Sequence, residues 1–196
     1  MVAGAENGSG QRRPLWRFVP WMVAALLLPL PLAAMRFTHE VNWDRADFTV
    51  FGAMLLGACG AHELATRMTG STAYRAAVAV AVMSAFILIW MNLAVGIIGS
   101  EDNPANLMYA GVLAVAVLGG LIVRFQPHGM AHVLVATALA QVLGGVIALA
   151  VGLGSTGANW PQAIVVLTGF FSALWLLSAW LFRRAARELM SAGAAP

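Results

Sequence analysis

The hydrophobic positions of the chain gather into six long apolar stretches separated by short polar ones. A helix needs about 20 apolar residues to cross the roughly 30 Å hydrocarbon core of a bilayer. The stretches that meet this length are 18–35, 47–67, 75–98, 105–124, 131–153 and 162–182. The connections between them are too short for a folded domain. The pattern therefore predicts an all-α fold, a polytopic membrane helix bundle with six transmembrane helices.

Charged residues predict the orientation of these helices. All 11 basic residues are arginines, of which nine fall on one side of the predicted helices and two on the other. An excess of arginine is typical of the cytoplasmic side. The nine are Arg12, Arg13, Arg17, Arg67, Arg75, Arg124, Arg183, Arg184 and Arg187. We therefore expect residues 1–17 to form a flexible cytoplasmic tail, residues 18–184 the transmembrane domain, and residues 185–196 a second cytoplasmic tail.

Composition excludes several classes of protein. Hydrophobic residues make up 61% of the chain and charged residues 10%, against roughly 45–50% and about 25% in ordinary soluble domains. A soluble enzyme, a disordered chain and a disulfide-stabilised secreted domain are therefore excluded. The sequence pI of about 10.0 would suggest nucleic-acid binding in a soluble protein. Here the arginines lie next to apolar segments, so we expect them to contact anionic lipids of the bilayer.

Polar residues inside the predicted spans are candidates for function, because they are costly in lipid. Asn92 and Gln141 carry amides that need partners between helices, and such partners are either neighbouring helices or a transported solute. Glu63 is the only acid in the interior of a predicted span, since Asp47 is the first residue of one. It lies four residues before Arg67, a spacing that favours an ion pair at the end of a helix. The alternative is that Glu63, Asn92 and Gln141 line a polar path.

Acidic residues gather in the two loops expected on the outer side. Asp47, Glu101 and Asp102 would attract cations if they surrounded the mouth of a pathway. Asp47 and the pair Glu101 and Asp102 also lie at the predicted starts of helices, where acids cap free amides and interact favourably with the helix dipole. Both interpretations fit the sequence.

Histidines suggest a competing function. His128 and His132 are four residues apart at the predicted start of the fifth helix, so one helical face carries both imidazoles. Together with His62 and Glu63, they would form a metal site or a haem site if the second and fifth helices were neighbours. Gly129 opposes this arrangement if it ends the helix.

Enzymatic motifs do not support catalysis. The segment from His62 to Thr66 lacks the second histidine of HExxH, and no P-loop, GxGxxG or GxSxG is found. The lone Cys59 excludes an intrachain disulfide. We therefore expect a non-enzymatic protein without a cofactor, with a metal- or haem-binding redox protein or enzyme as the alternative.

The first apolar stretch allows two interpretations. Residues 11–34 have the basic start, apolar run and small residues of a signal peptide, although the run is long for one. As a transmembrane helix, the stretch is expected to kink at Pro29 and Pro31, because proline removes an amide donor.

A resemblance to known proteins centres on the third and fourth stretches. The segment that carries it is NLAVGIIGSEDNPAN, residues 92–106. It resembles a segment found in a family of multi-pass proteins of bacterial inner membranes. The resemblance implies an inner-membrane location and no particular activity. We therefore expect a small permease-like protein or an accessory subunit of a membrane complex, with partner membrane proteins or a homo-oligomer as possible assemblies.

Overall fold

The computed structural model describes residues 18–38, 41–157 and 159–193. These residues form helices joined by loops, with no strand in the described ranges. The helices are α1 (Val19–Leu27), α2 (Leu30–Phe37), α3 (Arg45–Met68), α4 (Thr72–Ala94), η2 (Pro104–Leu107), α5 (Met108–Ile122), α6 (Pro127–Val151) and α7 (Gln162–Gly193). The predicted tail over residues 1–17 lies outside the described residues.

The six predicted apolar stretches are confirmed as helices. In the described part of the chain, six helices are long and apolar enough to cross a membrane, counting Val19–Phe37 and Pro104–Ile122 as one each. Large apolar side chains on their surfaces are exposed, among them Ile122 at 80%, Val151 at 68% and Leu139 at 65%. Water would not tolerate this much exposed apolar surface, whereas lipid would, so the fold is compatible with a membrane protein.

The chain divides into two compact units, residues 1–59 and 60–196. The first unit contains α1, α2 and the first turns of α3. As the prolines predict, the first span is interrupted between Leu27 and Leu30. Within this unit the Cys59 thiol donates to the Pro20 carbonyl at 3.4 Å. Cys59 is thus a small buried residue that packs against α1.

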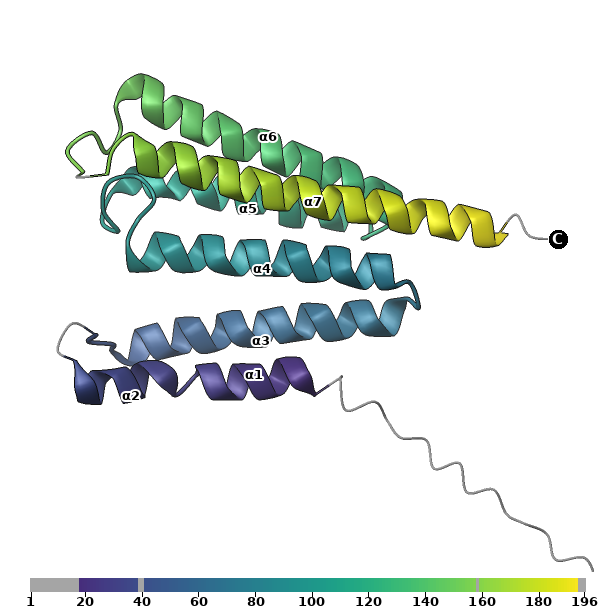
Figure 1. Ribbon diagram of the computed structural model, residues 1–196, viewed down its shortest axis with the longest axis horizontal. Coiled ribbons are helices and arrows are strands. Elements are labelled where there is room, and N and C mark those ends of the chain that lie inside the picture. Colours follow the sequence, from purple (N-terminus) through teal and green to yellow (C-terminus); the bar gives the residue numbers. More distant parts are fainter. Residues whose placement is uncertain (1–17, 39–40, 158, 194–196) are drawn as a thin grey trace, which may run out of the picture. The chain divides into compact units, whose positions relative to one another are not determined.

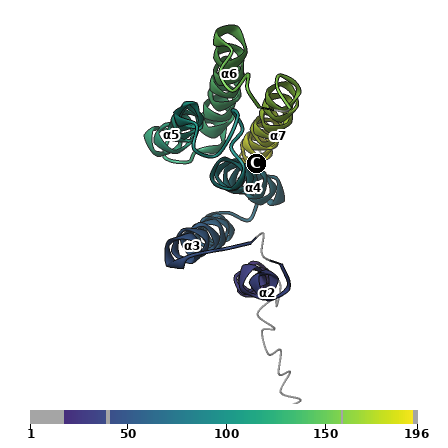
Figure 2. The ribbon, with the colours of Figure 1, turned by 90° about the vertical axis from the view of Figure 1, so that its left-hand side faces the viewer.

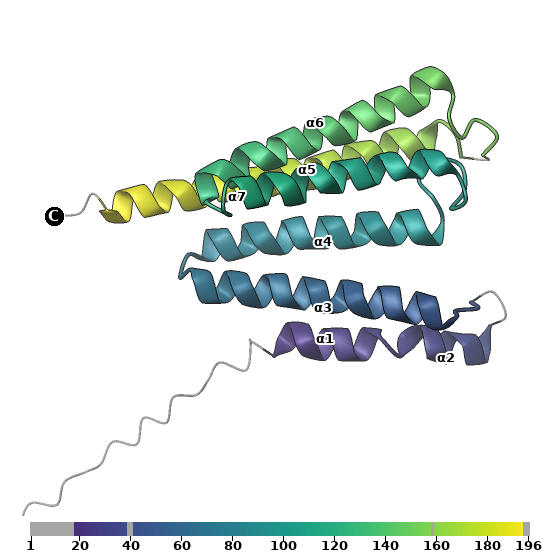
Figure 3. The same ribbon diagram turned by 180° about the vertical axis from the view of Figure 1, so that it is seen from behind.

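The second unit is an antiparallel helix bundle. Figures 1 and 3 show α4, α5, α6 and α7 running in alternating directions, and Figure 2 shows them around a common core. α7 packs extensively against both α4 and α6, and α5 packs against α6, whereas α4 and α5 touch only slightly. The core between them holds the large buried side chains of Tyr109, Leu134, Phe171, Trp175 and Phe182. This unit contains most of the buried polar groups.

Helix ends differ from the predicted ones where glycine or proline intervenes. α4 stops at Ala94 rather than residue 98, because Gly96 adopts a left-handed φ of +69°. α6 begins at Pro127 rather than residue 131, since Pro127 supplies a favourable first helical residue. Gly129 lies inside α6, so the expectation that it ends the helix is wrong. A Cβ at Gly129 would lie 2.6 Å from Val123 Cβ, so glycine allows this turn to approach the end of α5.

α7 continues well beyond the predicted end at residue 182. Its last turns, through Gly193, carry Glu188, which accepts a hydrogen bond from the Ser71 hydroxyl at 3.0 Å. Ser71 is also the N-cap of α4, where its hydroxyl accepts from the Tyr74 amide at 3.2 Å. The extension of α7 is therefore tied to the turn between α3 and α4.

Candidate functional site

Two loops close one end of the α4–α7 bundle. In the α4–α5 loop, Asn106 Oδ1 accepts from the Ile97 and Ile98 amides at 3.1 and 2.9 Å, and its Nδ2 donates to the Ser100 carbonyl at 2.7 Å. Asn103 caps the following helix, and its side chain accepts from the Ala105 amide at 3.0 Å. Residues 95–103 therefore form an ordered loop between α4 and η2.

The α4–α5 loop packs against the α6–α7 loop through glycines. Gly99 and Gly154 have φ values of +78° and +74°, and a Cβ at Gly99 would lie 3.2 Å from Gly154 Cα. Only glycine combines these backbone angles with so close an approach. We call this end of the bundle the glycine-loop end and the opposite end, where α6 begins, the arginine end.

A cavity of about 330 Å³ lies at the glycine-loop end. We call it the loop cavity. Its lining residues come from both loops and from the start of α7, and none of them is charged: Val95, Gly96, Ile97, Gly99, Gly154, Gly157, Asn159, Trp160, Ala163, Ile164 and Leu167. The cavity thus reaches along α7 as far as the residue before Thr168.

On α6, the neighbour of α7 in the bundle, Gln141 is fully buried. Neither its Nε2 nor its Oε1 has a hydrogen-bond partner among the described residues. A buried amide without partners costs about 1–3 kcal/mol, and a native protein rarely leaves such a group unused. Gln141 was predicted as a path residue from its position in the sequence, and it is the most unusual polar group in the bundle.

Polar groups of α7 face the same region. Thr168, Ser172 and Trp175 are spaced four and three residues apart, so they lie on one face of the helix. Thr168 Oγ1, Ser172 Oγ and Trp175 Nε1 are all buried and, like the Gln141 amide, lack a partner in the described part of the chain. This face of α7 therefore carries three buried hydrogen-bonding atoms without a partner of good geometry, and the Tyr109 hydroxyl adjoins the first of them.

The register between α6 and α7 places Gln141 beside this face. A Cβ at Gly145 would lie 2.9 Å from Thr168 Cγ2, so these two residues face each other. The helices are antiparallel, so Gln141, one turn before Gly145, lies level with Ser172, one turn after Thr168. The Gln141 amide and the Ser172 hydroxyl therefore share one depth in the bundle.

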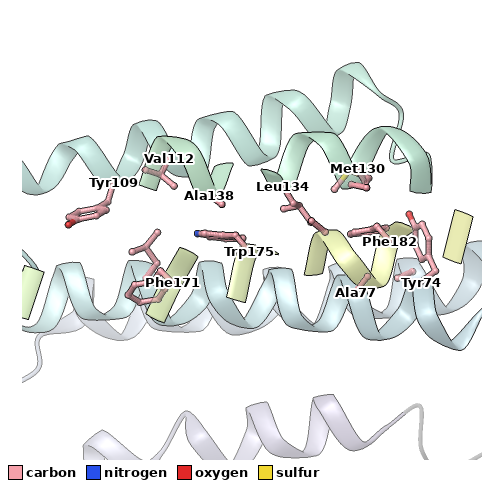
Figure 4. Packing of buried hydrophobic residues seen from close by; sticks show 14 of the residues in the cluster. Tyr74, Ala77, Tyr109, Val112, Met130, Leu134, Ala138, Phe171, Trp175 and Phe182 are labelled. Atoms are coloured by element: carbon pink, nitrogen blue, oxygen red, sulfur yellow. The ribbon is translucent and has the colours of Figure 1, made fainter. Parts of the chain in front are cut away.

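Tyr109 and Trp175 complete the group. The Tyr109 hydroxyl adjoins the Thr168 side chain and is buried without a partner that satisfies hydrogen-bond geometry within the described residues. Figure 4 shows Trp175 near Ala138, with its indole nitrogen directed toward the end of the bundle that holds Tyr109. We call Tyr109, Gln141, Thr168, Ser172 and Trp175 the polar cluster.

A second cavity, of about 290 Å³, lies on the other side of Trp175. We call it the apolar cavity. It occupies the seam where α4 and α5 touch only slightly, and its walls include Ala65, Val78, Leu113, Leu134 and Trp175. No charged side chain lines it in the described residues. The polar cluster therefore lies between two cavities and separates them.

The other predicted path residues lie elsewhere. The Ser178–Ala77 hydrogen bond aligns α4 with α7, which places Asn92 opposite residue 163, roughly 13 Å from the level of Ser172. The Asn92 Nδ2 donates to the Leu88 carbonyl at 2.8 Å, while its Oδ1 is buried without a partner among the described groups. Asn92 is thus closer to the loop cavity than to the cluster.

Glu63 is engaged in an ion pair. Its carboxylate accepts from Arg67 Nε at 2.8 Å, and the Arg67 side chain is 67% exposed. This pair stands at the end of α3, as the spacing of the two residues predicts. The polar cluster itself contains no charged residue.

The acidic residues of the two loops behave differently. Asp47 belongs to the first unit, where Asp44 and Asp47 cap α3 by accepting each other's backbone amides at 2.9 Å. Glu101 and Asp102 belong to the second unit and are exposed in the turn before Asn103. The capping interpretation thus holds for Asp47, whereas Asn103 rather than an acid caps the helix after Glu101.

The histidines do not meet as a metal site. His128 and His132 stack edge to face with ring centroids 4.8 Å apart. The described residues contain no group of three or more His, Cys, Asp or Glu side chains that could hold a metal ion, so His62 and Glu63 do not join them. The helical spacing brings the pair together, but α3 is not packed against α6.

Four members of the polar cluster, Tyr109, Thr168, Ser172 and Trp175, were not predicted from the sequence. Membrane hydroxyls such as those of Thr168 and Ser172 usually bond their own helix, as Ser84 and Thr137 do at 2.7 and 2.9 Å. Tyr109 resembles an interfacial tyrosine by position, yet it is only 1% exposed. The available signal was the spacing of Thr168, Ser172 and Trp175 along one face of α7.

Comparison with known proteins identifies no related protein. No protein-family model, no curated protein and no solved structure matches the chain. The geometry of the bundle is therefore the basis for any assignment of function.

Proposed function

We propose that this chain is an integral membrane protein of the permease type, which binds a small uncharged polar solute at the polar cluster. The observation that carries the proposal is the fully buried Gln141, whose amide has no hydrogen-bond partner among the described residues. In a helix bundle surrounded by lipid, such groups mark solute pathways.

The surroundings of Gln141 define the chemistry of the solute. The cluster offers a donor from Trp175, and groups that both donate and accept: the Gln141 amide and the hydroxyls of Tyr109, Thr168 and Ser172. These groups suit a molecule that carries amide or hydroxyl groups. An ion is disfavoured, because the described residues of the cluster and of both cavities include no charged side chain.

The two cavities suggest how the solute reaches the cluster. The loop cavity extends to Leu167, next to Thr168, and Trp175 itself forms part of the wall of the apolar cavity. Between them, Tyr109, Phe171 and Trp175 are each at most 1% exposed. Under this proposal the solute site is occluded, and movement of these aromatic side chains would open it to either side.

The arginine distribution supports a direction for this pathway. By the positive-inside rule the arginine end is cytoplasmic, so the loop cavity faces outward. The resemblance over residues 92–106 favours a bacterial inner membrane as the location. A fusion reporter placed after Ser100 that proved cytoplasmic would contradict this orientation.

Solute flux in proteoliposomes tests the proposal. Vesicles containing the full chain are mixed rapidly with hyperosmotic urea, glycerol, acetamide or sodium chloride, and light scattering follows the volume change. We expect faster entry of at least one uncharged solute than into protein-free vesicles, with no increase for sodium chloride. Gln141→Leu should slow that entry by about tenfold, since one hydrogen-bond partner is lost.

Thr137→Val is the matched control. Thr137 is also fully buried on α6, one turn from Gln141, but its hydroxyl already donates to the Val133 carbonyl. Its flux should equal that of the unmodified protein. Equal flux for Gln141→Leu, or no flux above empty vesicles for any solute, would overturn the proposal and leave ordered water as the occupant of the cluster.

A further inference from the structure

A third cavity lies at the arginine end, between the first turns of α6 and the last turns of α7. Its volume is about 550 Å³. The lining residues are His128, His132, Trp180, Arg183, Ala186, Arg187 and Met190. We call it the basic pocket. It is separate from the polar cluster, and the proposed solute pathway makes no use of it.

Arg183 and Arg187 give the basic pocket its charge. They are four residues apart, so both lie on the face of α7 that carries Trp180. Neither forms a salt bridge with another residue that the structure describes, and no acidic residue lines the pocket. Arg184, on the neighbouring face, does have a counter-ion, because its Nε donates to Glu188 at 3.3 Å. Two positive charges therefore point into a cavity without compensation.

The start of α6 adds hydrogen-bond donors on the opposite wall. Gln126 caps the helix without a side-chain hydrogen bond, Pro127 has no amide hydrogen, and the Met130 amide donates to the Gln126 carbonyl, so the His128 and Gly129 amides are the donors that this helix start offers. The positive end of the helix dipole points the same way. His132 Nδ1 donates to the His128 carbonyl at 3.0 Å, which fixes the orientation of the imidazole.

We propose that the basic pocket binds a phosphate group, held between Arg183 and Arg187 on one side and the first turn of α6 on the other. Guanidinium groups and helix N-termini are both established phosphate-binding elements. Trp180 is 50% exposed beside the pocket, as befits a side chain at the boundary between headgroups and acyl chains. An anionic phospholipid is the natural source of the phosphate at this depth, and free phosphate is the other source.

Native mass spectrometry of the full chain in mild detergent tests this site. The protein is titrated with phosphatidylglycerol or, in parallel, with phosphatidylcholine, and the bound fractions are compared. An arginine near a lipid surface contributes about fivefold in affinity. We therefore expect Arg183→Gln/Arg187→Gln to weaken phosphatidylglycerol binding by about twentyfold, with phosphatidylcholine binding unchanged.

Arg184→Gln is the control, because it removes a charge of the same helix that already has a partner. It should change phosphatidylglycerol affinity by less than about twofold. A second arm adds inorganic phosphate to the lipid-loaded protein. Retention of the lipid identifies a lipid headgroup as the source, whereas its displacement identifies free phosphate. The proposal would be overturned if Arg184→Gln and the double variant lost phosphatidylglycerol affinity equally, or if the double variant lost none.

Discussion

The α4–α7 and α6–α7 contacts of the second unit differ in whether their buried polar groups have hydrogen-bond partners. Where α7 packs against α4, the fully buried Ser178 hydroxyl donates to the Ala77 carbonyl at 2.7 Å. Where α7 packs against α6, the Gln141 amide and the Ser172 hydroxyl lie at one depth, and neither has a partner among the described residues. The first contact uses a polar group to hold two helices together, and the second leaves polar groups without a partner among the described residues.

The comparison shows that residue type alone does not reveal the role of a polar group in a membrane. Ser172 and Ser178 are both serines on buried positions of the same helix, six residues apart. Their environments differ because the Ser178 hydroxyl donates to a backbone carbonyl, whereas the Ser172 hydroxyl has no partner among the described residues. Substitutions at the two contacts therefore have different expected effects.

The largest expected effect on the free energy of unfolding comes from adding a methyl group where α6 packs closely against α7. At Gly145 an added methyl group would meet Thr168 at 2.9 Å from its Cγ2. We expect Gly145→Ala to lower the free energy of unfolding by about 1–3 kcal/mol, the usual cost of overpacking. Unfolding in a mixed detergent titration with increasing sodium dodecyl sulfate measures this change.

Gly144→Ala is the matched control at the neighbouring position. A Cβ there would have no described atom within 4 Å, so alanine should raise stability by up to about 1 kcal/mol through its better helix propensity. If both alanine variants had the same stability, the close contact between α6 and α7 would not exist as the structure has it.

Effects of intermediate size on the free energy of unfolding are expected for Ser178→Ala and Gln141→Leu. Their opposite signs test the difference between the α4–α7 and α6–α7 contacts. Ser178→Ala should lower the free energy of unfolding by about 0.6–1.5 kcal/mol, because it removes an interhelical hydrogen bond. Gln141→Leu should raise it by about 1–2 kcal/mol in the absence of solute, because an unpaired buried amide is removed. The same detergent titration measures both variants, and destabilisation by Gln141→Leu would indicate that its amide is satisfied.

The smallest effect is expected at the end of α3. Glu63→Gln removes an ion pair whose arginine is largely exposed, and such pairs contribute about 0–1 kcal/mol. We expect a change in unfolding free energy of less than about 0.5 kcal/mol and unchanged solute flux in the vesicle assay. Loss of solute flux in this variant would indicate that Glu63 is part of the pathway.

Much of the fold follows from local patterns that the sequence displays. The six apolar stretches, the interruption at Pro29 and the cap at Asn103 were all predictable, because length, proline and capping chemistry act within a few residues. The end of α4 was misplaced by the same logic, since the left-handed conformation of Gly96 depends on the loop that Asn106 binds.

The candidate site was predictable only in part. Gln141 stands out in the sequence, because an amide in a predicted span needs a partner. Its lack of one, and its position beside Ser172, depend on the approach of α6 to α7 at Gly145. Asn92, Glu63 and Gln141 were expected along one path, yet their helices hold them at different places.

The sequence by itself determined the number of apolar helices, their approximate limits and the bias of arginine toward one side, since each depends on hydropathy and charge along a single segment. Only the tertiary structure decided which buried polar groups share a depth and which find a partner. Those properties depend on helix register and on close approach at glycine, which couple residues far apart in the chain. The pairing of Ser178 and the isolation of Gln141 are the clearest results of that coupling.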